Sequence, residues 1–256
     1  MVTVSEQGDR RDRRMAAAGG GRVVLVTGGS RGIGLACARR FQELGDRVAV
    51  TYRSKPPDGD GDPLLCLRCD VTSQDDVDEA FAAVEERWGP VEVLVANAGV
   101  TRDGLLLRMS EAAWSEVLDA NLTGAYRVAR RAAGPMVRSR RGRIVLVSSV
   151  VAHLGAAGQA NYAAAKAGLV GLARSLAREL ASRGVTVNIV APGPVATDML
   201  ASLSQDRLEE IRASVPLGRI ASAEEVASAI AYLASPEAAF VTGAVLPVDG
   251  GLGMGH

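Results

Sequence analysis

Lysine is almost missing from this chain. Of its 29 basic residues only two, Lys55 and Lys166, are lysines, and the others are arginine. A lysine kept against that preference indicates a task that needs a compact ammonium on a flexible stem rather than the planar fork of arginine. Histidine is as scarce, with only His153 and the terminal His256. Because neither cysteine nor aspartate adjoins His153, the sequence gives no support to a catalytic imidazole.

Cysteine is also rare, which limits what the chain can build from sulfur. Cys37, Cys66 and Cys69 are an odd number in a sequence without a secretory leader, so we expect free thiols. Cys66 and Cys69 form a C-x-x-C, but a second ligand pair is missing and the motif lies in an apolar run typical of a strand. We therefore expect no metal site.

Two further absences bear on location and partners. The sequence has no apolar run of about 18 residues, and its first residues are polar and charged where a leader would be apolar. The formal net charge is zero, which gives no support to binding of nucleic acid or of a membrane surface. The sequence therefore predicts a cytoplasmic protein that binds neither nucleic acid nor membranes.

Apolar runs separated by amphipathic stretches fill most of the chain. Residues 1–21 carry clustered charges followed by alanine and glycine, so we expect a disordered tail there and a single domain over 22–256. The predicted strands are 23–26, 48–51, 64–67, 91–96, 144–147, 186–190 and 244–248. The predicted helices are 33–44, 74–88, 112–137, 162–182 and 224–234. This alternation predicts an α/β Rossmann-type, doubly wound, seven-stranded parallel sheet. Residues 199–216 fall outside the alternation and are predicted to form a substrate loop over the crevice.

Lys166 follows a tyrosine by four residues, in Asn-Tyr-Ala-Ala-Ala-Lys. On a helix this spacing puts the Tyr162 phenol and the Lys166 ammonium on one face. A nearby cation favours the phenolate, so we expect the pKa of Tyr162 to lie below its usual value of about 10. Such a phenol exchanges a proton with a carbonyl or alcohol oxygen. The accompanying hydride cannot come from a side chain, so a cofactor is required.

A glycine-rich turn follows the first predicted strand and precedes a helix. Residues 27–34 read Thr-Gly-Gly-Ser-Arg-Gly-Ile-Gly, a G-x-x-x-G-x-G spacing in place of the more usual G-x-G-x-x-G. Glycines let the backbone approach a pyrophosphate, and the helix start offers free N–H groups and a positive dipole end. The residues predicted to bind the dinucleotide here are Gly28, Ser30, Arg31, Gly32, Ile33 and Gly34.

The second predicted strand indicates which dinucleotide is bound. A NAD site places a carboxylate at the end of this strand, but here none occurs before Asp58. Arg53 together with Arg31 suits a 2′-phosphate, which charge-assisted hydrogen bonds would hold. We therefore predict NADP(H). The alternative is that both are ordinary surface arginines in an arginine-rich chain.

The glycine turn, the Tyr162–Lys166 pair and the order of the elements resemble the short-chain dehydrogenase/reductase family over residues 22–256. Further matching motifs are Asn97-Ala98-Gly99, Asn121, Ser149 at thirteen residues before Tyr162, and Pro192-Gly193 with Thr197. Within the family, segments 97–103, 155–171, 216–219 and 248–256 are most similar to the 3-oxoacyl-acyl-carrier-protein reductases of type II fatty acid synthesis, especially those of high-GC bacteria. Some members of that branch act on long acyl chains.

The resemblance implies a role for each catalytic residue. Ser149 would hold the ketone oxygen beside Tyr162, which would donate the proton. Lys166 would lower the pKa of Tyr162 and bond the nicotinamide ribose, and Asn121 would hold a water that relays protons toward Lys166. Two other interpretations remain open: Ser149 as a strand-end hydroxyl that caps backbone, and Asn121 as a packing or capping residue.

Further residues would line the cofactor and the substrate. Those implied for the cofactor, besides the glycine turn, are Arg53, Asp70 and Val71 beside the adenine, Asn97, Ala98 and Gly99 at the ribose, Pro192, Gly193, Val195 and Thr197 near the nicotinamide and phosphates, and Tyr162 and Lys166. The predicted substrate pocket comprises Ser149, Tyr162, His153 and Leu154, the last two as the wall around the acyl chain.

The resemblance implies NADPH-dependent reduction of 3-oxoacyl-acyl-carrier-protein to the 3-hydroxyacyl form. It also implies a homotetramer built through residues 112–137, residues 162–182 and the last strand, with small residues for close helix approach at Ala163, Ala164, Ala167, Gly168 and Gly171. We expect the acidic carrier protein to dock on a basic rim next to the pocket, formed by Arg138, Arg140, Arg141, Arg143 and Arg183. The alternatives are an acetoacetyl-CoA reductase, a polyketide ketoreductase, a sugar or steroid dehydrogenase, and a non-catalytic nucleotide sensor.

Overall fold

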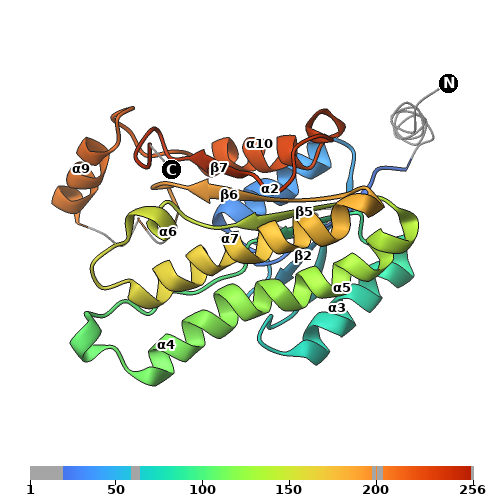
Figure 1. Ribbon diagram of the computed structural model, residues 1–256, viewed down its shortest axis with the longest axis horizontal. Helices are drawn as coiled ribbons and strands as arrows, with labels where there is room; N and C mark the ends of the chain where they lie inside the picture. The colour runs from blue at the N-terminus through green and yellow to red at the C-terminus, as the bar shows by residue number, and fades with distance from the viewer. Residues whose placement is uncertain (1–19, 59–63, 198–199, 201–203, 255–256) are drawn as a thin grey trace.

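The computed structural model describes residues 20–58, 64–197, 200 and 204–254 (Figure 1). Within this part of the chain seven strands form one parallel sheet in the order β3-β2-β1-β4-β5-β6-β7. The bounds are β1 Val23–Val26, β2 Arg47–Tyr52, β3 Leu65–Arg68, β4 Val93–Ala96, β5 Gly142–Val147, β6 Val185–Pro192 and β7 Val245–Val248. This confirms the predicted α/β fold, while the predicted tail lies, except for residues 20–21, outside the described residues.

All strand pairs are parallel, so the strands begin at one edge of the sheet and end at the other. We call these the amino edge and the carboxyl edge. The strand order reverses between β1 and β4, and in sheets of this kind ligands bind at the carboxyl edge of that reversal. The fold therefore places a crevice where the glycine turn leaves β1.

Helices cover both faces of the sheet, which explains why the strands are apolar throughout. Helices α3 (Gln74–Trp88), α5 (Gly124–Ser139) and α7 (Ala160–Leu180) pack on one face, and α2 (Gly32–Glu43) and α10 (Ala223–Leu233) pack on the other. Successive residues of β1 alternate between the two cores: Leu25 faces α3 and α5, and Val26 faces α2. Burying each such side chain stabilises the fold by about 1.5–3 kcal/mol.

The helix predicted over 112–137 is divided into three parts. The parts are α4 (Glu111–Leu118), a π-helical turn η2 (Asp119–Thr123) and α5. In η2 the amide of Gly124 donates to the carbonyl of Asp119, five residues earlier. The wider turn inserts a residue into the helical period, which an apolar pattern does not reveal, and such turns are frequent at functional sites. Asn121 lies on this turn.

Short elements at the carboxyl edge were not predicted. They are η1 (Leu106–Arg108), α6 (Val151–Leu154) and α9 (Gln205–Ser214), while η3 (Ala181–Arg183) and η4 (Pro236–Ala238) lie elsewhere. Helix α9 occupies most of the predicted substrate loop, of which residues 199 and 201–203 lie outside the described residues. Figure 1 shows α6, α9 and the start of α7 gathered at one end of the molecule. No helix in the described part is long and apolar enough to cross a membrane.

Candidate active site

The three side chains predicted to do the acid–base chemistry meet at the carboxyl edge. Ser149 follows the end of β5, and Tyr162 and Lys166 lie one turn apart near the start of α7. The Ser149 hydroxyl and the Tyr162 phenol share a hydrogen bond, and the Lys166 Nζ atom lies 5.6 Å from the centre of the Tyr162 ring. Ser149 also accepts a hydrogen bond from the amide of Val151 at 3.2 Å, so it caps backbone as well.

Lys166 is buried, with only 4% of its surface exposed. Its ammonium donates to the carbonyl of Val147 at 2.8 Å, and its own carbonyl accepts from the Ser148 hydroxyl at 2.9 Å. The end of β5 therefore fixes both the backbone and the side chain of the lysine. Burial lowers the pKa of Lys166 to about 8, because the charged form loses its hydration.

The prediction that the pKa of Tyr162 lies below its usual value is wrong for this structure. Burial raises the pKa of Tyr162 above its ordinary value, the hydrogen bond from Ser149 opposes this shift, and the negative charge of Asp103 adds to it. Desolvation outweighs the attraction because the ammonium points to the carbonyl of Val147 and burial also disfavours its own charge. The phenol is therefore protonated at neutral pH, which suits a proton donor.

The side chain of Asn121 is occupied by the loop that follows β4. Its Oδ1 accepts from the amide of Val100 at 2.7 Å, and its Nδ2 donates to the carbonyl of Val100 at 2.9 Å. A β-carbon on Gly99 would lie 3.0 Å from Oδ1 of Asn121 and 3.6 Å from Nζ of Lys166, so both side chains face the same side of this glycine. The structure thus gives the Asn121 side chain a packing role, and its predicted part in a water relay stays a prediction.

The glycine turn is held against the end of β4. Gly28 has a positive φ of 65°, and a β-carbon on it would lie 2.9 Å from the Cα of Ala98. The Nδ2 group of Asn97 donates to the carbonyls of Thr27 and Gly28, both at 3.1 Å. Only glycine fits both the left-handed backbone and the close approach at Gly28. Residues 97–99, predicted at the ribose, therefore lie directly against the predicted phosphate turn.

The start of α2 is suited to an anion. Its first turn has no side-chain cap and no acidic residue, so the free N–H groups and the dipole face the glycine turn. Thr197 lies over this turn, since a β-carbon on Gly32 would be 3.2 Å from its Cγ2 atom. The same loop after β6 packs through Gly193 on Asp249, and Val195 bridges to Ala221. The residues present fit the pyrophosphate of a dinucleotide.

Two predicted contacts for the 2′-phosphate lie at this turn. The amide of Gly29 donates to the carbonyl of Thr51 at 2.9 Å, which ties the end of β2 to the glycine turn. Arg53 is exposed two residues beyond Thr51, and Arg31 is exposed at the position before α2. Both guanidinium groups therefore belong to the edge where the adenine ribose of a bound dinucleotide would lie.

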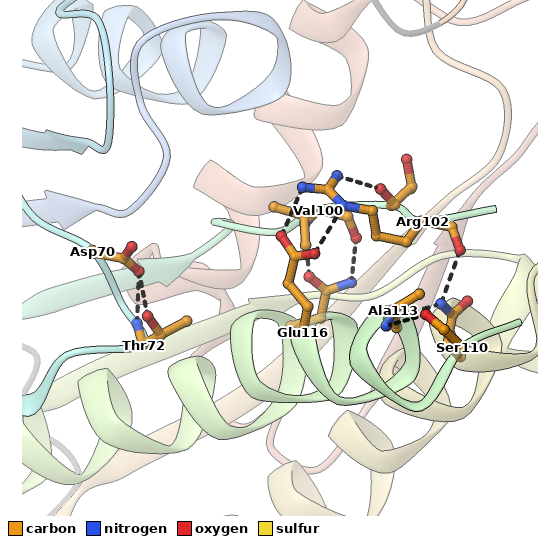
Figure 2. Close-up of polar contacts among 10 residues, drawn as sticks. Asp70, Thr72, Val100, Arg102, Ser110, Ala113 and Glu116 are labelled. Carbon is orange, nitrogen blue, oxygen red and sulfur yellow. Dashed lines mark hydrogen bonds and ion pairs between the residues drawn. The ribbon is translucent and has the colours of Figure 1, made fainter.

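Asp70 and Val71 follow the end of β3. Figure 2 shows the Asp70 carboxylate turned onto Thr72, and it accepts from the amide and the hydroxyl of Thr72 at 2.9 and 2.8 Å. Val71 packs on the start of α5, where a β-carbon on Gly124 would lie 2.7 Å from its Cγ2 atom. The structure thus gives Asp70 a role in shaping its own turn, and its predicted contact with adenine stays a prediction.

His153 and Leu154 lie on α6, immediately after Ser149, and both are exposed. Leu105, Leu106 and Leu107, in and beside η1, are also exposed apolar residues. The amide of Gly104 donates to the carbonyl of Gly158 at 2.8 Å, so the segment before η1 lies beside the segment before α7. His153 and Leu154 therefore lie at the catalytic edge, the acyl pocket stays a prediction, and the sequence analysis overlooked the neighbouring leucines.

The predicted basic rim does not lie next to the pocket of its own chain. Arg138 and Arg140 end α5, which leads into the start of β5, and Arg183 ends η3, which leads into the start of β6. Arg140 donates to the carbonyl of Ser182 at 3.1 Å, which joins the two groups of cations. These cations, with Arg141 and Arg143, lie at the amino edge of the sheet, whereas Ser149 lies at the carboxyl edge.

Asn161 is a residue of the site that the sequence analysis missed. It precedes Tyr162, is fully buried, and bonds backbone groups on three segments. A signal was present, because asparagine is nearly as scarce as lysine: the chain has four, at 97, 121, 161 and 188. Each of the four donates from its amide to a backbone carbonyl of another segment.

Comparisons with known proteins agree with this geometry. The profile of a family described as enoyl-(acyl carrier protein) reductase matches residues 28–253. The chain is 52% identical to the 3-oxoacyl-acyl-carrier-protein reductase MabA of Mycobacterium avium, over 92% of this chain and 91% of that protein. It is 47% identical to the 3-oxoacyl-acyl-carrier-protein reductase FabG of Vibrio cholerae and 45% identical to that of Escherichia coli K12, in each case over 91% of this chain and 98% of the relative.

Proposed function

Because this chain belongs to the short-chain dehydrogenase/reductase family, we propose that it reduces 3-oxoacyl-acyl-carrier-protein to the 3-hydroxyacyl product with NADPH. The observation that carries the proposal is the Ser149–Tyr162 hydrogen bond beside Lys166, at the edge of the sheet where the glycine turn lies. The relatives whose alignments cover about nine tenths of this chain are named for the same reaction.

The chemistry divides between the cofactor and the side chains. Bound NADPH would supply the hydride that adds to the ketone carbon. The Ser149 hydroxyl would donate a hydrogen bond to the ketone oxygen, and the Tyr162 phenol would give that oxygen its proton. Burial keeps the phenol protonated at neutral pH, so it starts in the form that donates. The Lys166 ammonium, one turn away, would stabilise the phenolate left behind and return a proton to it from solvent.

The preference for NADPH over NADH rests on charge at the end of β2. No carboxylate lies among residues 51–57, and Arg53 and Arg31 both lie at the glycine turn. A 2′-phosphate would gain charge-assisted hydrogen bonds there, whereas a free 2′-hydroxyl would find no carboxylate to accept from it.

We propose a homotetramer in which α5 and α7 pack on their counterparts across a two-fold axis. On α7 the small residues Ala164, Ala167 and Gly171 are exposed on one stripe. Gly168, predicted for the same stripe, instead packs inside the chain, where a β-carbon on it would lie 2.8 Å from Leu122. The edge strand β7 offers a second contact. Light scattering at micromolar concentration tests the assembly, and a monomer would contradict it.

The matching family is named for reduction of an enoyl group, which is a C=C bond. The relatives are named for reduction of a 3-oxoacyl group, which is a C=O bond. The paired hydroxyls of Ser149 and Tyr162 favour the ketone, since its oxygen can accept from both donors at once. The test measures NADPH oxidation with acetoacetyl and crotonyl thioesters, each on carrier protein and on CoA. Turnover of the acetoacetyl thioesters, faster on carrier protein, is expected. Turnover of the crotonyl thioesters alone would establish the enoyl reaction instead, and a clear preference for CoA would favour an acetoacetyl-CoA reductase.

A further inference from the structure

Three asparagine side chains hold the loop that joins β4 to η1. Asn97 bonds the glycine turn, Asn121 bonds Val100, and Asn161 bonds Arg102. The hydrogen bonds of Asn97 connect the loop to the predicted phosphate site. Those of Asn121 connect it to the π-helical turn, and those of Asn161 connect it to the helix that carries Tyr162. Asn161 is the member of the three for which the sequence predicted no role.

Asn161 uses every hydrogen-bonding group of its amide. Nδ2 donates to the carbonyl of Arg102 at 3.0 Å and to the carbonyl of Ala113 at 3.2 Å, while Oδ1 accepts from the amide of Tyr162 at 2.8 Å. The residue is fully buried. Two donors are needed at Nδ2, so neither an aspartate nor a single hydroxyl can replace this amide.

The two carbonyls that Asn161 joins belong to segments that are also linked by an ion pair. The guanidinium of Arg102 bonds both carboxylate oxygens of Glu116 on α4, at 2.8 and 2.6 Å, and Figure 2 shows these residues one above the other. This pair is half exposed, so it is screened by water and contributes little. The buried amide is therefore the stronger connection between α7, α4 and the loop.

We propose that Asn161 is a positioning residue that sets the Tyr162 phenol relative to the loop lining the cofactor. Its Oδ1 fixes the backbone amide of Tyr162, and its Nδ2 fixes the loop whose other end touches the glycine turn. A reacting oxygen must lie within hydrogen-bond reach of Tyr162 while its carbon faces the hydride, and a misplacement of about 1 Å costs on the order of 10²-fold in rate. The proposal rests on the proposed function for its rate measurements.

Asn188 provides a matched control for Asn161. It is equally buried, and its amide likewise joins backbone groups of separate segments, donating to the carbonyl of Val241 at 2.8 Å and accepting from the amide of Ala244 at 3.1 Å. It lies in the middle of β6, bonds the segment that leads into β7, and is not in the catalytic or binding machinery. A purely structural role would make the two asparagines equivalent.

The experiment compares Asn161→Asp and Asn161→Ser with Asn188→Asp and Asn188→Ser. The serine variants are included because a buried carboxylate can prevent folding. We expect each folded Asn161 variant to lose about 30- to 100-fold in kcat while KM and NADPH affinity stay within about threefold. The Asn188 variants are expected to melt at a similarly lowered temperature yet keep kcat within about twofold. Retention of kcat in a folded Asn161 variant, or an equal loss in the Asn188 variants, overturns the proposal.

Hydrogen exchange provides a readout that is independent of the substrate. With NADPH present, the amides of residues 100–104 and of the first turn of α7 are expected to exchange faster in Asn161→Ser than in the wild type, and unchanged in Asn188→Ser. An absence of turnover by the wild-type enzyme would overturn the proposed function alone, whereas unchanged exchange in Asn161→Ser would overturn the positioning role alone.

Discussion

The carboxyl and amino edges of the sheet are held together by different kinds of polar contact. At the carboxyl edge the buried contacts are the neutral amides of Asn121 and Asn161, which bond only backbone, whereas the ion pair of Arg102 with Glu116 is half exposed. At the amino edge the contacts are ion pairs, such as the largely buried Arg22 with Asp46 at 2.6 Å and the partly exposed Arg141 with Glu92 at 3.3 Å. The same seven strands run through both edges, so the sheet topology does not determine whether amides or ion pairs are used there.

The difference follows from what each edge must do. A charge placed beside Tyr162 changes its pKa, as the shift caused by Asp103 shows, whereas a neutral amide fixes geometry with far less effect on the local field. At the amino edge no proton is transferred, so the charges of ion pairs there do not act on a reacting group. Changes at the carboxyl edge should therefore affect catalysis more than changes at the amino edge do.

The largest effect is expected from Tyr162→Phe. The change removes the proton donor and little else, because the ring and its packing stay. We expect kcat to fall by at least about 10³-fold while the affinity for NADPH stays within a few-fold. Steady-state kinetics and a fluorescence titration of NADPH measure the two quantities. Most of the wild-type kcat remaining would exclude Tyr162 as the acid.

The substitution Lys166→Met, also at the carboxyl edge, is expected to lower activity and to raise stability. We expect kcat to fall by about 10²-fold, since the phenolate loses its cation. The variant should nevertheless be more stable than the wild type at pH 7, by about 1–2 kcal/mol, because burying the charged lysine costs more than its bond to Val147 returns.

The pH dependence of this gain follows from the sign of the shift. Burial lowers the pKa of Lys166 to about 8, so between about pH 8 and 10.5 the unfolded chain binds more protons than the folded one. Wild-type stability therefore recovers as pH rises through that window, and the advantage of Lys166→Met should vanish above it. Urea unfolding of both proteins at pH 7 and near pH 10 measures this; a variant that is no more stable at pH 7 would show that the buried charge is well compensated.

Much of the fold and of the site was predictable from local patterns. Apolar runs marked each strand because both faces of the sheet are covered, and the scarcity of lysine indicated Lys166. The glycine turn was recognisable because its close approach and positive φ admit no other residue at Gly28. Periodicity and residue type report local constraints, and these features are local.

The features that could not be predicted from the sequence depend on tertiary structure. The π-helical turn at Asp119–Thr123 depends on one extra residue in a helical period, and the sequence pattern around Asn121 looks continuous. The direction of the Tyr162 pKa shift depends on the balance between burial and charge, which spacing alone does not reveal. The sequence analysis placed Arg140 beside the pocket because it is basic. In a parallel sheet, however, a residue between a helix and the next strand lies at the amino edge, whereas Ser149 follows the end of β5 at the carboxyl edge.

Arg53→Asp tests a charge at the carboxyl edge that is exposed rather than buried. The change removes a cation suited to the 2′-phosphate and adds a carboxylate that accepts from a 2′-hydroxyl. We expect the ratio of kcat/KM for NADPH to that for NADH to fall by about 10- to 100-fold, which one or two charge-assisted hydrogen bonds account for. Kinetics with both cofactors measure the ratio. An unchanged ratio would make Arg53 an ordinary surface charge.

The smallest effect concerns the amino edge, and it depends on a second copy of the chain. Helix α7 is 21 residues, or roughly 30 Å, long. If α7 pairs antiparallel with its counterpart, the cations at the end of one copy lie near the Tyr162 end of the other. Arg140 and Arg183 would then steer the acidic carrier protein to the partner's pocket. We expect Arg140→Glu with Arg183→Glu to raise KM for the acyl-carrier substrate by about 3- to 10-fold, more at low salt, and to spare the CoA analogue.

Mixed assemblies decide whether the rim serves its own pocket or the neighbouring one. Subunits carrying Arg140→Glu and Arg183→Glu keep an intact Tyr162, and Tyr162→Phe subunits keep an intact rim. When the two are unfolded and refolded together, pairs form in which an active pocket faces the rim of an inactive subunit. If the rim acts across the interface, these pairs regain a low KM for the carrier substrate, in proportion to their share of the mixture. The contrary outcome is a KM for the carrier substrate that stays high in the mixture while the rate with the CoA analogue follows the number of intact tyrosines. It would show that the cations of the amino edge play no part in carrier binding.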